Sequence, residues 1–174
     1  MHPRIIEGLL GIFIFSTLGC RVHHDPVESP SSPSITSGRE LLRSKRTDCF
    51  GTCPAYELVL FESGHLRYEG FSYVKNAGPV EVRVGPSAIA TIRSNLERMS
   101  TLATDCCNCN DMTDMPSVDM TFSGVGGRMK RIDHYYGCEK APDWLYDVEN
   151  SIEAALETER WVGQKAQYKA YHPR

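Results

Sequence analysis

The chain has 174 residues, a hydrophobic content of 41% and a formal net charge of −3 at pH 7. This length and composition predict a single soluble folded domain. The weak negative charge provides no electrostatic basis for binding nucleic acid, because a protein that binds the phosphate backbone needs a basic face.

The chain begins with a short apolar run, residues 8–19, that ends at Cys20. A bilayer span needs about 20 apolar residues, whereas the apolar part of an export signal has about 7 to 15. The run and the basic Arg4 before it resemble a bacterial lipoprotein signal. This resemblance implies that residues 1–19 are a signal peptide and that the Cys20 sulfur carries lipid. An ordinary signal peptide and an uncleaved anchor are the alternatives.

The expected location follows from the residue after the lipidated cysteine. Arg21 stands there, in place of the Asp that marks inner-membrane retention in enteric lipoproteins. By that resemblance we expect the outer membrane, facing the periplasm. The expected partners are the membrane, through the lipid, and an envelope protein or a cell-wall component.

Residues 20–46 contain the lipidated Cys20 and a stretch rich in Pro and Ser. Such a stretch has few apolar groups to bury and cannot offset its ordering entropy. It predicts an extended tether, with the folded domain over residues 47–160.

Alternating apolar residues predict three strands near the start of this domain, over residues 56–60, 66–68 and 80–84. A helix follows over residues 87–99, because four apolar residues share one face at spacings of three and four: Ile89, Ile92, Leu96 and Met99. Residues 101–116 are expected to form a loop.

In the second half of the domain, strands are predicted over residues 118–122 and 128–136 around a glycine turn. A helix opens at Pro142, with the core residues Leu145, Val148, Ile152 and Ala155 and a solvated face of Glu149, Glu153 and Glu157. The order β-β-β-α-β-β-α predicts an α+β fold. It consists of a mostly antiparallel sheet of about five strands with two helices packed on one face.

The chain has seven cysteines. With Cys20 assigned to lipid, the even remainder indicates disulfides in an exported protein, and the candidates are Cys49, Cys53, Cys106, Cys107, Cys109 and Cys138. Cys49 and Cys53 are close enough to bridge locally, and Cys138 is expected to reach back to residues 106–109. Cys106 and Cys107 are expected to have different partners, because a bridge between neighbours is strained.

The cysteine-rich loop has two alternative uses. It contains a C-x-x-C spacing, so it offers a zinc site whose ligands would be Cys106, Cys109, Cys138 and His134. The same thiols could instead serve redox chemistry. Because thiolates oxidise in the periplasm, structural disulfides without a cofactor are the preferred interpretation.

A longer motif surrounds the first two cysteines: Arg46-Thr47-Asp48-Cys49-Phe50-Gly51-Thr52-Cys53-Pro54-Ala55-Tyr56. It resembles the signature of the bacterial family called domain of unknown function 6438, many of whose members are lipoproteins. Similar stretches follow at residues 63–70, 114–117 and 135–137, so that the similarity covers about residues 46–160. The resemblance implies a compact extracytoplasmic α+β domain with no known catalytic role.

The sequence has neither a G-x-S-x-G nucleophile motif nor a phosphate-binding glycine loop. It therefore predicts a non-enzymatic binding or structural module. Residues 161–174 form a basic, aromatic tail that could contact anionic lipid or glycan. The simpler interpretation is a helix end followed by a frayed segment, with Trp161 folded back onto the core.

Overall fold

The computed structural model describes residues 38–109 and 114–163. The predicted signal peptide, Cys20, residues 20–37 and residues 164–174 lie outside these ranges. The described strands are β1 (Glu40–Arg46), β2 (Ala55–Phe61), β3 (His65–Ser72), β4 (Gly78–Arg83), β5 (Ser117–Ser123) and β6 (Met129–Tyr135). The helices are α1 (Pro86–Met99), the 3₁₀ turn η1 (Val125–Gly127), α2 (Asp143–Ala155) and α3 (Glu159–Val162).

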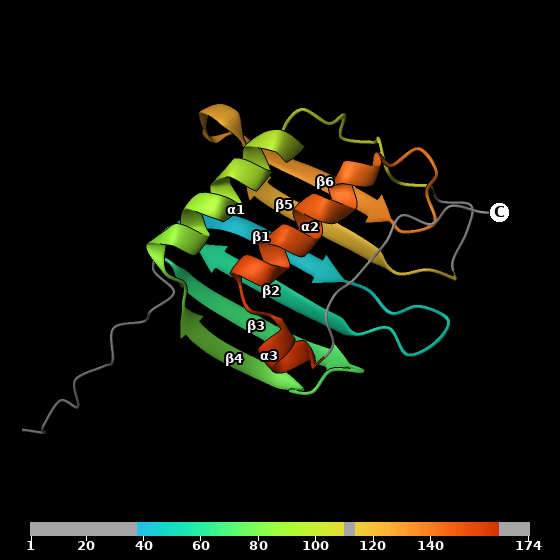
Figure 1. Cartoon of the computed structure of the whole chain (residues 1–174), viewed down its shortest axis with the longest axis horizontal. Helices are drawn as coiled ribbons and strands as arrows, with labels where there is room; N and C mark the ends of the chain where they lie inside the picture. Colours follow the sequence, from blue (N-terminus) through green and yellow to red (C-terminus); the bar gives the residue numbers. More distant parts are fainter. Residues whose placement is uncertain (1–37, 110–113, 164–174) are drawn as a thin grey trace, which may run out of the picture. The chain divides into compact units, whose positions relative to one another are not determined.

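The six strands form one antiparallel sheet in the order β4-β3-β2-β1-β5-β6 (Figure 1). The α+β class and the antiparallel sheet are confirmed, and the strands found from residue 55 onward agree with the predicted ones. The predicted count of five strands is too low because β1 was not recognised. Figure 1 shows β1 in the middle of the sheet, between β2 and β5.

The prediction that residues 40–46 belong to the tether is therefore wrong, and the domain begins before residue 47. In β1, Leu42, Ser44 and Arg46 are buried, while Arg43 and Lys45 between them are more exposed. Leu41 is buried as well, so two of the four buried residues are polar, and the strand lacks the apolar alternation that reveals its neighbours. Pairing with strands on both sides supplies its backbone hydrogen bonds.

Both main helices pack on one face of the sheet. The buried residues Ile92 and Leu96 of α1 and Leu145 and Ile152 of α2 belong to the same apolar core. That core also contains the alternate strand residues Leu58, Leu60, Leu66, Tyr68, Val118, Met120, Phe122 and Ile132. The predicted arrangement of two helices on one face is thus confirmed, and no described helix has the length and apolar content needed to cross a membrane.

The opposite face of the sheet, which we call the open face, carries charged side chains that form ion pairs within and between strands. Arg43 on β1 contacts Glu40 at 2.5 Å and Glu57 of β2 at 2.8 Å. Arg131 on β6 contacts Asp119 of β5 at 2.6 Å. Opposite charges across neighbouring strands stabilise a solvated sheet face modestly.

The end of the described chain folds back onto the core through α3. Trp161 is 7% exposed and its ring lies 5.6 Å from that of Tyr68. The Trp161 and Val162 carbonyls accept hydrogen bonds from the amides of Asn76 and Lys75, which join α3 to the β3–β4 connection. The expected packing of Trp161 is confirmed, so residues 161 and 162 belong to the domain.

Candidate functional site

Between α2 and the sheet lies a group of polar side chains that are each at most 6% exposed. We call this group the buried polar network, and its members are Arg46, Tyr56, His134, Tyr136, Glu149 and Glu153. Strands β1, β2 and β6, the residue after β6, and helix α2 each contribute to it. Buried charges are costly unless they are paired and hydrogen-bonded, so the contacts of this network decide its effect on stability.

One half of the network is centred on the Glu153 carboxylate. Its Oε1 atom accepts hydrogen bonds from Arg46 Nε at 2.5 Å and from the Tyr56 hydroxyl at 2.6 Å. The guanidinium of Arg46 also lies near the Tyr136 ring, with Cζ 5.3 Å from the ring centroid. A buried carboxylate is therefore balanced by a cation and held by a hydroxyl donor.

The other half is centred on Glu149. Its Oε2 accepts a hydrogen bond from the Tyr136 hydroxyl at 2.7 Å, and its Oε1 lies 2.8 Å from His134 Nδ1. The Tyr136 hydroxyl also accepts a hydrogen bond from Arg46. Tyr136 therefore connects the two carboxylates, and the polar side chains under α2 form one continuous hydrogen-bonded chain.

This arrangement overturns the predicted solvated face of α2. Glu149 and Glu153 are buried, at 2% and 6% exposure, and only Glu157 of the predicted face is exposed, where it pairs with Arg160 at 2.9 Å. Residues four apart share a helix face, so Glu149 and Glu153 both turn toward the sheet. The partners that make their burial possible come from distant strands, and sequence periodicity cannot show them.

Burial raises the pKa of the Tyr136 phenol well above its ordinary value, and Glu149 and Glu153 add to that rise while Arg46 opposes it. Burial likewise raises the pKa of Tyr68 and of Tyr146 to about 12. Below pH 10 these phenols are protonated in both the folded and the unfolded chain. Between pH 10 and about 12 the unfolded chain loses these protons first, so the free energy of unfolding falls as pH rises.

We therefore expect Tyr136→Phe to make this alkaline loss of stability shallower, since one phenol that ionises only on unfolding is removed. The measurement is urea unfolding at several pH values between 9 and 11. The control is Tyr73→Phe, which removes a hydroxyl from a side chain that is 56% exposed. An identical slope in the wild type and in Tyr136→Phe would contradict this assignment.

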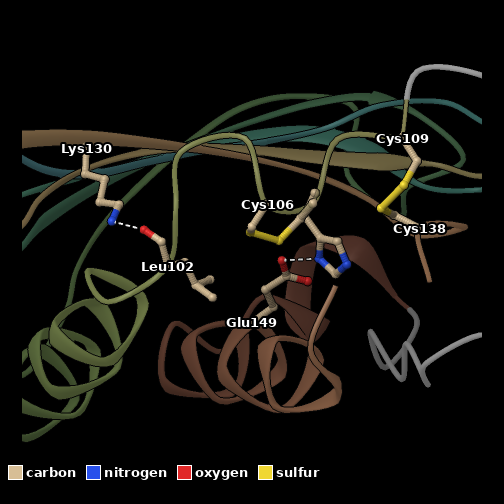
Figure 2. The surroundings of a disulfide bond; sticks show 8 residues. Leu102, Cys106, Cys109, Lys130, Cys138 and Glu149 are labelled. Atoms are coloured by element: carbon tan, nitrogen blue, oxygen red, sulfur yellow. Dashed lines mark hydrogen bonds and ion pairs between the residues drawn. A yellow bond between two sulfur atoms is a disulfide. The ribbon is translucent and has the colours of Figure 1, made fainter. Parts of the chain in front are cut away.

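The six cysteines of the domain are bonded as Cys49–Cys53, Cys106–Cys107 and Cys109–Cys138. Two of these bridges agree with the predictions: the local Cys49–Cys53 bridge, and the bond that joins Cys138 to the cysteine-rich loop. The expectation of different partners for Cys106 and Cys107 is wrong. Because Cys109 takes Cys138, the two neighbours are left to each other. Figure 2 shows both bridges of this region, with Glu149 among the surrounding residues.

The alternative zinc site is not formed. Its four candidate ligands, Cys106, Cys109, Cys138 and His134, are engaged in two disulfides and in the contact with Glu149. Within residues 38–109 and 114–163, no three His, Cys, Asp or Glu side chains are grouped to hold a metal ion. The sequence suggested His134 as a zinc ligand, whereas its observed partner is Glu149. It did not indicate that Arg46, Tyr136, Glu149 and Glu153 belong to one cluster.

The fold and the cysteine pairs together define a disulfide-bonded α+β domain with two helices on one face of an antiparallel sheet. The family model described as "Domain of unknown function (DUF6438)" matches residues 40–156, more than half of the chain, so the chain belongs to this family. The match begins at the first residue of β1 and thus includes the unexpected central strand. A comparison with curated proteins gives no match.

Proposed function

We propose that this chain is a lipid-anchored protein of the bacterial cell envelope, and that its domain is a non-enzymatic binding or structural module. The observation that carries the proposal is the pairing of the cysteines. All six cysteines in the described residues form disulfides, and the seventh, Cys20, follows the apolar N-terminal run. Disulfides persist in oxidising compartments, which supports export, and the leftover cysteine is the one that the lipoprotein signal would modify.

The burial of the polar network supports a non-enzymatic role. His134, Glu149 and Glu153 would be the natural acid–base groups of a hydrolytic site, yet they are 0%, 2% and 6% exposed. A general base must come within hydrogen-bond reach of its substrate. No substrate reaches side chains so enclosed, and their contacts instead tie α2 to β1 and β6. We therefore assign this network to the stability of the domain.

The open face supports a binding role. Both main helices cover the other side of the sheet, so the open face is the sheet surface left for a partner. Its exposed charges include both signs, as in the Arg131–Asp119 pair. Such a surface suits a polar envelope protein or cell-wall component, which charged side chains can orient.

The anchor is tested by replacing its sulfur. We expect Cys20→Ser to abolish incorporation of an alkyne-labelled fatty acid and to move the protein from the membrane fraction to the soluble fraction of a bacterial host. The readout is click labelling of the purified full chain, with intact-mass measurement of the processed N-terminus. The double variant Cys49→Ser/Cys53→Ser is the matched control and should keep the label. Equal labelling of Cys20→Ser and wild type would exclude this function.

A further inference from the structure

The Cys106–Cys107 bridge differs from the other two in what it can stabilise. Its cysteines are adjacent, whereas the other bridges span sequence separations of 4 and 29. A disulfide stabilises mainly by restricting the unfolded chain, and the effect grows with the length of the closed loop. A bridge between neighbours restricts that chain least. The Cys106–Cys107 bond is therefore expected to contribute little to the stability of the domain.

Its two sulfurs have different environments. Cys106 is partly exposed, whereas Cys107 is 0% exposed and belongs to the apolar core. The Cys107 carbonyl accepts a hydrogen bond from the Tyr135 amide at 3.0 Å, which places Cys107 beside β6. Cys106, although it packs against the core, is therefore the residue of the pair that a thiol in solvent can approach, and Cys107 would be the buried leaving group.

The adjoining residue of β6, His134, has an unused hydrogen-bonding atom. Its Nδ1 contacts Glu149 at 2.8 Å, while its Nε2 is buried and has no hydrogen-bond partner among the described residues. A carboxylate at Nδ1 favours the tautomer with the proton on Nδ1, which leaves Nε2 as an acceptor. Figure 2 shows the Glu149 carboxylate, with its dashed contact to this imidazole, among the surroundings of the bridge. This acceptor belongs to the residue before Tyr135, whose amide donates to the Cys107 carbonyl.

We propose that Cys106–Cys107 is a thiol–disulfide exchange site that accepts electrons from an external thiol. This inference goes beyond the anchoring and binding roles, and it holds whether or not Cys20 carries lipid. Each chain is reduced once and does not turn over a substrate, so the exchange is compatible with a non-enzymatic domain. Its substrate class is a thiol, supplied either by a small molecule or by a dithiol protein.

The exchange proceeds in two steps. The donor thiolate attacks Cys106 Sγ, forming a mixed disulfide, and the electron pair of the broken S–S bond stays on Cys107 Sγ, which takes up the proton that the donor thiol released. A second donor thiol then attacks the donor sulfur of the mixed disulfide. Cys106 leaves and becomes a thiol, and the donor leaves as a disulfide. Two electrons have passed from the donor to Cys106 and Cys107.

The test is graded reduction of the native full chain. One series uses reduced glutathione and the other uses a thioredoxin, followed by alkylation, digestion and mass spectrometry of each cysteine. We expect Cys106 and Cys107 to be alkylated at a donor concentration at least about tenfold lower than the cysteines of the other two bridges require, with one or both donors. Prior or simultaneous reduction of either other bridge, with both donors, would overturn the proposal. So would a peptide map that pairs Cys106 or Cys107 with another cysteine.

Single variants test which sulfur is attacked. In Cys107→Ser the remaining Cys106 thiol is partly exposed, whereas in Cys106→Ser the remaining Cys107 thiol is buried. We expect oxidised glutathione to form a mixed disulfide at least about tenfold faster with Cys107→Ser than with Cys106→Ser. Circular dichroism checks that both variants fold. Equal rates in two folded variants would contradict the assignment of Cys106 as the attacked sulfur.

Discussion

Arg46→Met is expected to destabilise the domain by about 3–5 kcal/mol, one of the two largest effects in the chain, because it leaves the Glu153 carboxylate buried without its cation. The side chains of this pair are 1% and 7% exposed, and Arg46 Nε lies 2.5 Å from Glu153 Oε1. The free energy of unfolding is measured by urea denaturation with the disulfides intact. The double variant Arg46→Met/Glu153→Gln should recover part of the loss, since the buried charge is then absent.

Arg43→Met is the matched control on the same strand. Arg43 also pairs with two glutamates, but its side chain is 40% exposed and its partners are 35% and 27% exposed. Ion pairs open to solvent contribute about 0–1 kcal/mol, so the control should cost no more than that. Equal losses for the two arginine variants would show that the buried polar network does not stabilise the domain more than a surface pair does.

Removing the long-range disulfide is expected to have the second large effect. The double variant Cys109→Ser/Cys138→Ser should lose about 3.5 kcal/mol, because the bridge closes a loop with a sequence separation of 29. It also joins the cysteine-rich loop to the segment between β6 and α2. The measurement is again urea unfolding, with the remaining bridges verified by mass spectrometry.

The control for this variant is Cys106→Ser/Cys107→Ser. The same chain-entropy argument assigns the bridge between neighbours less than about 1 kcal/mol. The difference between the two double variants therefore measures the effect of loop length within one segment of the chain. A larger loss for the adjacent pair than for Cys109→Ser/Cys138→Ser would contradict this account, and it would give the adjacent bridge a structural role.

Much of the fold could be predicted because its elements follow their hydrophobic periods. Leu58 and Leu60 alternate in β2, and Ile92, Leu96 and Met99 share one face of α1; all are buried as expected. Strand β1 escaped prediction because Arg46, a residue that usually indicates the surface, occupies an inward position. A polar residue at an inward position breaks the alternation on which strand prediction depends.

The buried polar network could not be predicted for a related reason. Glu149 and Glu153 are spaced as the solvated face of a helix would be, and only their partners on β1, β2 and β6 and at Tyr136 make burial favourable. Those partners lie far away in the sequence, and a single sequence carries no signal for such pairings. The local Cys49–Cys53 bridge was predictable for the opposite reason, since its two sulfurs are only four residues apart.

The central position of β1 has a consequence for the order in which the sheet is completed. Synthesis runs from the N-terminus, so β1 is the first of the described strands to be made, and β2 to β4 can pair beside it as soon as they follow. The other edge of β1 stays unpaired until β5 has been made, because that edge pairs with β5, for example through Leu42 and Phe122. Contacts of such high sequence separation form slowly, and an unpaired strand edge can join another chain in the interval. The nascent half-sheet is therefore the stage at which this protein would most need a chaperone.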